Sequence, residues 1–215
     1  MITETTYFRH YAVALFVCLC SPAFAMDKDE DAAFDLAVEA VHSRNYAEAI
    51  AGFRPLAEHG AADAQFNMAL LLKAGLGQPR NYLEAYYWAV LSDLGNERRA
   101  QAMVSELSEF LPVEARAGVY DRLLARLEAQ LEAGERSAIM KYARLYAEFL
   151  EEPDLERAYI WYSIAQALGI RGGADGSAAL SDQLEPDALI AAQTKAAEVF
   201  GASLFSQPTA SSVSE

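Results

Sequence analysis

After Met26 the chain shows helical periodicity almost throughout, and its helical segments repeat. Alanine, leucine and aromatic residues recur at spacings of three and four, which is typical of amphipathic helices, and no stretch shows the alternation of a strand. The run LEAYYW, which ends at Trp88, returns as LERAYIW, which ends at Trp161, about 73 residues further on. A fixed period of this length predicts stacked units that each bury an apolar face against the next.

Glycine and proline divide this pattern into segments of helical length, so we expect an all-α fold of antiparallel helix pairs. The repeat domain is expected over 26–205, in units of about 31–112 and 113–200, with a disordered polar tail at 206–215. The glycine-rich segment Gly169–Gly176 is expected to be a loop. The expected helices are 31–43, 46–58, 61–74, 81–94, 97–110, 113–133, 135–148, 154–168, 177–183 and 186–200.

The first 25 residues have the features of a secretory signal peptide. A positive flank precedes the apolar run Tyr11–Cys20, and the small-x-small sequence Ala23-Phe24-Ala25 follows it. A membrane-spanning helix needs about 20 apolar residues, twice the length of this run. Neither Cys18 nor Cys20 follows the small residue that a lipoprotein anchor requires. We therefore expect cleavage after Ala25, export to the periplasm or the extracellular space, and no stable membrane insertion of the mature chain.

The charge balance restricts the partners that the chain can bind. Lysine and arginine total 17 against 31 aspartates and glutamates, which gives a formal net charge of −14. Nucleic acids and anionic membranes are bound through clustered lysine and arginine, so neither is expected as a partner. A protein or peptide of basic character is expected instead. Cleavage would also remove both cysteines, so the mature chain would have no disulfide.

A set of motifs resembles the Sel-one-like repeat (SLR) family, a relative of the tetratricopeptide repeats. In the first half these motifs are AQFNMA from Ala64 to Ala69, the turn Gly75-x-Gly77, the helix motif Ala85-x-x-Trp88, and Gly95. The second half repeats the helix motif as Ala158-x-x-Trp161, whereas Pro153 stands in place of the glycine turn. The resemblance covers residues 34–100 and, with less agreement, 115–200. It implies an α-hairpin solenoid, a right-handed superhelix of paired helices.

The motif residues have expected packing roles. Gly75 and Gly77 are expected at positive φ, where they end one helix and turn the chain. Asn81 and Asp154 are expected to cap the helices that follow them. The residues expected to pack between helices are Ala64, Ala69, Ala85, Ala143, Trp88 and Trp161.

No catalytic, cofactor-binding or metal-binding constellation is expected. After residue 25 the histidines are His42 and His59, with no cysteine, so no zinc motif of ordinary spacing exists. The sequence Asp27-x-Asp29-x-Asp31 begins like a calcium loop, but Ala32 stands where that loop needs glycine. These aspartates are expected to form an acidic segment that leads into a helix.

A binding surface is expected on the first helix of each hairpin. Helices 61–74 and 135–148 would form a concave wall. Two interpretations of the recurring tyrosines and tryptophans stay open: they form the core between helices, or some of them grip a bound peptide. The residues expected to contact a bound segment are Asn67, Lys73, Tyr142, Arg144 and Tyr146.

The expected function is that of an exported, non-enzymatic scaffold or adaptor. The resemblance implies it, because SLR proteins act as interaction scaffolds and exported bacterial members resemble regulators of envelope complexes. One alternative is a secreted, hydrolase-like enzyme acting on the cell wall, against which the lack of an SxxK motif counts. Another is a structural subunit that completes its superhelix in a larger assembly and would carry an apolar terminal face.

Overall fold

A computed structural model describes residues 26–203 and residue 205, and these residues are all-helical, with no strand among them. The expected signal peptide, 1–25, and the expected tail, 206–215, lie outside the described residues. The elements are α1 (Met26–His42), α2 (Tyr46–His59), α3 (Ala62–Ala74), α4 (Tyr82–Leu94), α5 (Arg98–Phe110), α6 (Val113–Glu132), α7 (Ser137–Arg144), the π-helical turn η1 (Leu145–Phe149), α8 (Leu155–Ala167), α9 (Gly173–Ser181) and α10 (Pro186–Ala202).

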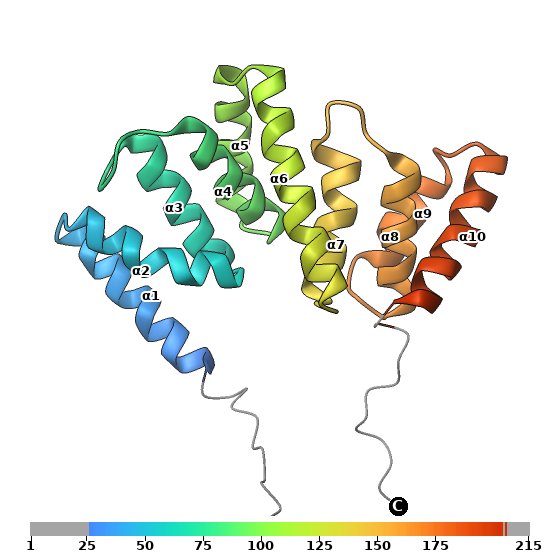
Figure 1. Ribbon diagram of the computed structural model, residues 1–215, viewed down its shortest axis with the longest axis horizontal. Coiled ribbons are helices and arrows are strands. Elements are labelled where there is room, and N and C mark those ends of the chain that lie inside the picture. Colours follow the sequence, from blue (N-terminus) through green and yellow to red (C-terminus); the bar gives the residue numbers. More distant parts are fainter. Residues whose placement is uncertain (1–25, 204, 206–215) are drawn as a thin grey trace, which may run out of the picture.

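The helices pack mainly against their neighbours along the chain, as a helical repeat requires. They form one curved row that runs from α1 and α2 at one end to α10 at the other (Figure 1). A contact between helices two places apart in the chain also occurs twice, since α4 packs against α6 and, at the corresponding place further along, α8 packs against α10. Helix α7 joins the halves through its contacts with α4 and α6 on one side and α8 on the other.

The turn between α3 and α4 is built as the motif predicts. Gly75 and Gly77 both have positive φ, +73° and +78°. A Cβ atom on Gly77 would lie 2.6 Å from the backbone of Tyr46, so this glycine also lets the turn pack against the start of α2. The caps are confirmed as well, since Asn81 accepts the backbone N–H of Glu84 and Asp154 accepts that of Arg157 (3.0 and 2.9 Å).

The core runs between the helices along the row, and it contains most of the repeated motif. Trp88 is 3% exposed, and its ring packs edge-on against Tyr87. Trp161 is only partly buried, so the expectation that both tryptophans fill interhelix space is correct for Trp88 and only partly so for Trp161. The alanines expected at close helix contacts, Ala64, Ala69, Ala85 and Ala143, are fully buried, and so is Ala158 of the repeated helix motif.

Three expected boundaries are wrong. The first helix begins at Met26 rather than residue 31, so the acidic segment lies inside α1. The expected helix 135–148 is the α-helix 137–144 followed by the wider turn of η1. The glycine-rich segment is only half loop, because α9 begins at Gly173.

The glycines of α9 bring it close to α8. A Cβ atom on Gly176 would lie 2.4 Å from the Tyr162 ring, and one on Gly173 would lie 2.5 Å from the backbone nitrogen of Gln166. Glycine at these two positions therefore serves helix packing rather than chain reversal.

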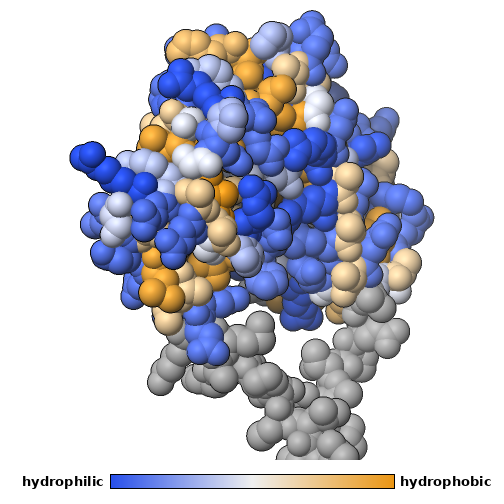
Figure 2. Space-filling view, turned by 60° about the vertical axis from the view of Figure 1, so that its left-hand side comes forward, coloured by the Kyte–Doolittle hydropathy of each residue, from blue (hydrophilic) through white to orange (hydrophobic). Residues whose placement is uncertain are grey.

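The face drawn in Figure 2 is largely hydrophilic, with separate hydrophobic patches. Figure 2 shows such patches over the face where the α1–α3 end of the row comes forward. Among the exposed apolar side chains, Tyr82 and Phe110 stack on each other with ring centroids 6.2 Å apart. In the part of the chain that the structure describes, no helix is both long enough and apolar enough to span a bilayer.

Candidate functional site

Two of the five predicted contact residues are engaged within the protein on α3. The side-chain nitrogen of Asn67 donates to the backbone oxygen of Asp63 in its own helix (3.0 Å). Lys73 forms an ion pair with Glu106 on α5. Neither contact brings these residues to the predicted residues of α7.

Tyr142 and Tyr146 are brought together, and both are buried. Their rings meet edge-on with centroids 5.0 Å apart, and their hydroxyl oxygens are 3.3 Å apart. Tyr142 donates to the Glu128 carboxylate of α6 at 2.5 Å, while Arg157 of α8 donates to the Tyr146 hydroxyl at 3.1 Å. Burial, and then the hydrogen bond to Glu128, raises the pKa of Tyr142, so its hydroxyl is a neutral donor at ordinary pH.

Arg144 faces a different side of α7. Residues two apart on an α-helix point in nearly opposite directions, so Tyr142 and Arg144 cannot share one surface. The Arg144 guanidinium donates to the backbone oxygen of Asp93 at 2.8 Å and pairs with the carboxylates of Asp93 and Glu148 (3.4 and 2.8 Å). Of the five predicted residues, the structure thus brings together only the two tyrosines.

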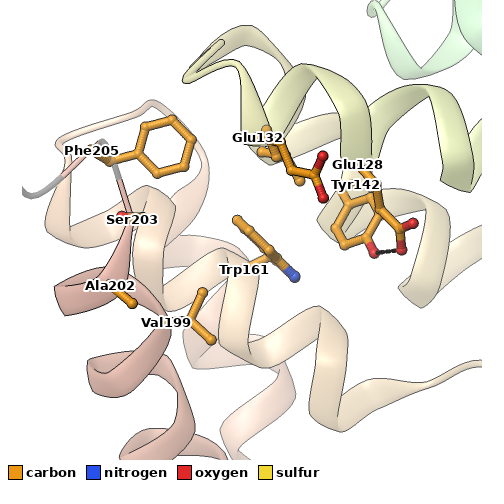
Figure 3. Close-up of a pocket in the computed structure, with 9 residues that line it drawn as sticks. Glu128, Glu132, Tyr142, Trp161, Val199, Ala202, Ser203 and Phe205 are labelled. Carbon is orange, nitrogen blue, oxygen red and sulfur yellow. Dashed lines mark hydrogen bonds between the residues drawn. The ribbon is translucent and has the colours of Figure 1, made fainter.

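A groove opens beside Tyr142. Helices α7 and α8 line it together with the carboxyl-terminal ends of α6 and α10. We call it the α6–α10 groove, and its volume is about 460 Å³, within the range of small-ligand and peptide-anchor sites. Figure 3 shows its side chains converging from the four helices. The residues that line it are Glu128, Leu131, Glu132, Tyr142, Trp161, Val199, Ala202, Ser203 and Phe205.

Trp161 stands in the middle of this groove. One side of its indole meets Tyr142 edge-on, with ring centroids 5.2 Å apart, which fixes the ring against α7. Val199 and Ala202 lie on the opposite side of the ring, with Phe205 above them (Figure 3). A rigid aromatic ring that is only partly covered, with aliphatic walls, is suited to hold an apolar side chain of a partner.

The charged residues that line the groove are both acidic. Glu128 and Glu132 lie one helical turn apart on α6 and are both exposed. Glu128 already accepts the Tyr142 hydroxyl, which orients its carboxylate at the rim of the groove (Figure 3). No lysine, arginine or histidine is among the lining residues, so two carboxylates face the groove without a lining cation.

The sequence pattern pointed to Tyr142 and to a tryptophan in each unit, but it missed the rest of the groove. Glu128 and Glu132 could have been noticed as an i, i+4 pair, yet an acidic chain contains many such pairs. Val199 and Phe205 belong to the last helix and the segment after it, and no local signal links them to Trp161.

No group of three or more His, Cys, Asp or Glu residues within the described ranges, 26–203 and 205, is arranged to hold a metal ion. In comparisons with known proteins, no family model matches the sequence, and no curated protein is significantly similar to it.

Proposed function

We propose that this protein is an exported, non-enzymatic adaptor of the SLR type, a right-handed α-hairpin solenoid that binds a segment of another protein. The proposed occupant of the α6–α10 groove is a segment with a bulky aliphatic side chain flanked by lysine or arginine. Support for the repeat architecture comes from the sequential packing of the helices and from the shared α4–α6 and α8–α10 contacts. Support for export comes from the sequence features of residues 1–25, and amino-terminal sequencing of the mature protein tests it.

The observation that carries the binding proposal is the half-buried Trp161 beside two carboxylates. The indole and the aliphatic residues Val199 and Leu131 offer apolar contact, and burying an apolar side chain there would supply most of the affinity. Glu128 and Glu132 would attract the flanking basic residues. Because the whole chain carries −14, the same attraction would speed the encounter and weaken as salt is added.

A pair of matched peptides tests this proposal by isothermal titration. The first has a leucine between two lysines, and the second has the same sequence with the lysines replaced by glutamate. We expect the first peptide to bind, with an affinity that falls as sodium chloride rises from 20 to about 300 mM, and the second peptide not to bind. Equal affinity for both peptides, or none for either, would remove the support for this function.

Variants of the chain then locate the binding surface. Glu132→Gln should weaken the lysine peptide, and Trp161→Ala should abolish its binding. Glu114→Gln is the matched control, because Glu114 is an exposed glutamate on the same helix at the end away from the groove. A Glu114→Gln effect as large as that of Glu132→Gln would mean that only the net charge matters.

A further inference from the structure

A second hollow lies on the opposite side of α7 from the α6–α10 groove. It opens between the α4–α5 turn, α7 and the loop before α9, and we call it the α4–α9 cleft. Its volume is about 910 Å³, in the upper part of the range for sites that enclose a small organic molecule. The residues that line it are Asp93, Leu94, Asn96, Glu97, Arg98, Gln101, Met140, Arg144, Arg171 and Gly172.

Backbone geometry and helix register both shape this cleft. Met140 and Arg144 are four residues apart on α7, so they lie on one face of that helix and form one wall. Asn96 has a positive φ of 67° in the α4–α5 turn, and Gly172 has a φ of +87° before α9. A Cβ atom on Gly172 would come within 3.1 Å of the Met140 side chain, so glycine keeps this rim open.

The two acidic residues of the cleft are already paired with arginines. The Asp93 carboxylate forms an ion pair with the Arg144 guanidinium, which also forms an ion pair with Glu148. The Glu97 carboxylate accepts two hydrogen bonds from the Arg99 guanidinium, both at 2.9 Å, and these hold the pKa of Glu97 at about 2. Neither carboxylate therefore remains to neutralise a further cation.

The other two guanidinium groups of the cleft belong to Arg98 and Arg171. Arg98 is the first residue of α5 and Arg171 lies on the loop before α9, so they approach the cleft from different elements. Neither forms an ion pair with any residue in the part of the chain that the structure describes. In a protein of net charge −14, this cleft is lined by three arginines against two carboxylates, which is a local excess of positive charge.

We propose that the α4–α9 cleft binds a small organic dianion, a dicarboxylate or a phosphorylated molecule. Arg98 and Arg171 would each donate a pair of charge-assisted hydrogen bonds to one of its oxyanion groups, the geometry in which guanidinium groups bind carboxylate and phosphate. Met140, which is only partly buried, would contact the carbon skeleton between those groups. This site is independent of the proposed peptide groove, which lies on the other face of α7 and has the opposite charge.

The test is a titration of the full chain with small anions at constant ionic strength, in which ¹H–¹⁵N NMR spectra record the chemical shifts of the backbone amides. The probes are succinate, glycerol phosphate and, as an uncharged analogue of succinate, succinamide. We expect saturable shifts with at least one of the two dianions, largest for the backbone amides of residues 93–98 and 171–173, and none with succinamide. Absence of saturable shifts with both dianions would overturn the proposal, as would equal shifts with succinamide.

The double variant Arg98→Gln/Arg171→Gln provides the second arm. Because both side chains are exposed and unpaired within the described residues, the variant should keep its helicity and melting temperature while its affinity for the dianion falls at least about tenfold. Arg136→Gln, an exposed arginine outside the cleft, is the matched control and should bind as the unmodified protein does. Equal affinity of the double variant and the control for the dianion would contradict the assigned site. This outcome does not depend on whether the α6–α10 groove binds a peptide.

Discussion

Trp88 and Trp161 end the same sequence motif, but the structure gives them different roles. Trp88 is 3% exposed inside the core, while Trp161 is partly exposed in the α6–α10 groove. Trp88→Ala should therefore lower the free energy of unfolding by about 3–5 kcal/mol, the cost of deleting a large buried aromatic. Trp161→Ala should cost clearly less, about 1–2 kcal/mol, because part of its surface is already in water.

Urea unfolding followed by circular dichroism measures both costs. Among the described residues the indole nitrogen of Trp88 has no hydrogen-bond partner, so Trp88→Phe keeps most of the packing without losing a hydrogen bond seen there. It should cost less than Trp88→Ala and serves as the conservative control. Equal losses for the two alanine variants would mean that Trp161 is a core residue and not a binding residue.

Glu97 gives a test of the electrostatics at one residue. The Arg99 guanidinium and the Arg99 backbone N–H lower the pKa of Glu97 to about 2, against about 4.3 for an ordinary glutamate. Since the folded-state pKa is depressed, the stabilisation is present above the unfolded value and is lost as pH falls through the folded value. A carboxyl NMR titration should find a midpoint near 2, and Arg99→Gln should return it toward 4. A midpoint above 4 in the unmodified protein would contradict the Glu97–Arg99 geometry.

At the scale of the element, α9 depends on close contact with α8. Gly176→Ala would place a methyl group 2.4 Å from the Tyr162 ring, so we expect a loss of about 1–3 kcal/mol from overpacking. Gly118→Ala is the matched control, since Gly118 lies in α6 and its added methyl would meet nothing within 4 Å. That control should raise the melting temperature slightly, because alanine favours a helix over glycine. A destabilised Gly118→Ala beside an unaffected Gly176→Ala would reverse the argument.

Local signals in the sequence were sufficient to predict most helices and turns, but they were misleading for α9. The glycine turn after α3 and the caps at Asn81 and Asp154 act within a few residues, so their sequence is sufficient to predict them. The glycines of α9 have the same local signature as a loop. Their role depends on Tyr162 and Gln166 in another helix, and spacing within 169–176 contains no information about that contact.

The candidate site shows the same limit. Helical spacing places Tyr142 and Arg144 on one short helix, but which face of that helix meets α6 and which meets the α4–α5 turn follows from long-range packing. The prediction that both contact one bound segment overlooked the fact that residues two apart diverge on a helix. Only the tertiary structure shows that Glu128 and Val199 line the groove.

At the scale of the whole molecule, α7 separates two hollows of opposite electrostatic character. One side has Trp161 and two carboxylates, and the other has three arginines and two carboxylates, with no ion pair at Arg98 or Arg171 among the described residues. In the proposed function, the protein would hold a basic segment of a partner on one side of α7 and a small dianion on the other. The strong overall negative charge favours the first interaction at long range, whereas the second depends on the local excess of positive charge.

The central claim is that a basic, apolar segment binds against Trp161, and the fluorescence of that residue tests it most directly. The chain has two tryptophans, so Trp88→Phe leaves Trp161 as the only one. Titration of this variant with the lysine-flanked leucine peptide should shift the indole emission to shorter wavelength, saturably, because the peptide removes water from the ring. Emission that stays unchanged while calorimetry records peptide binding would show that the peptide binds elsewhere and would contradict the account.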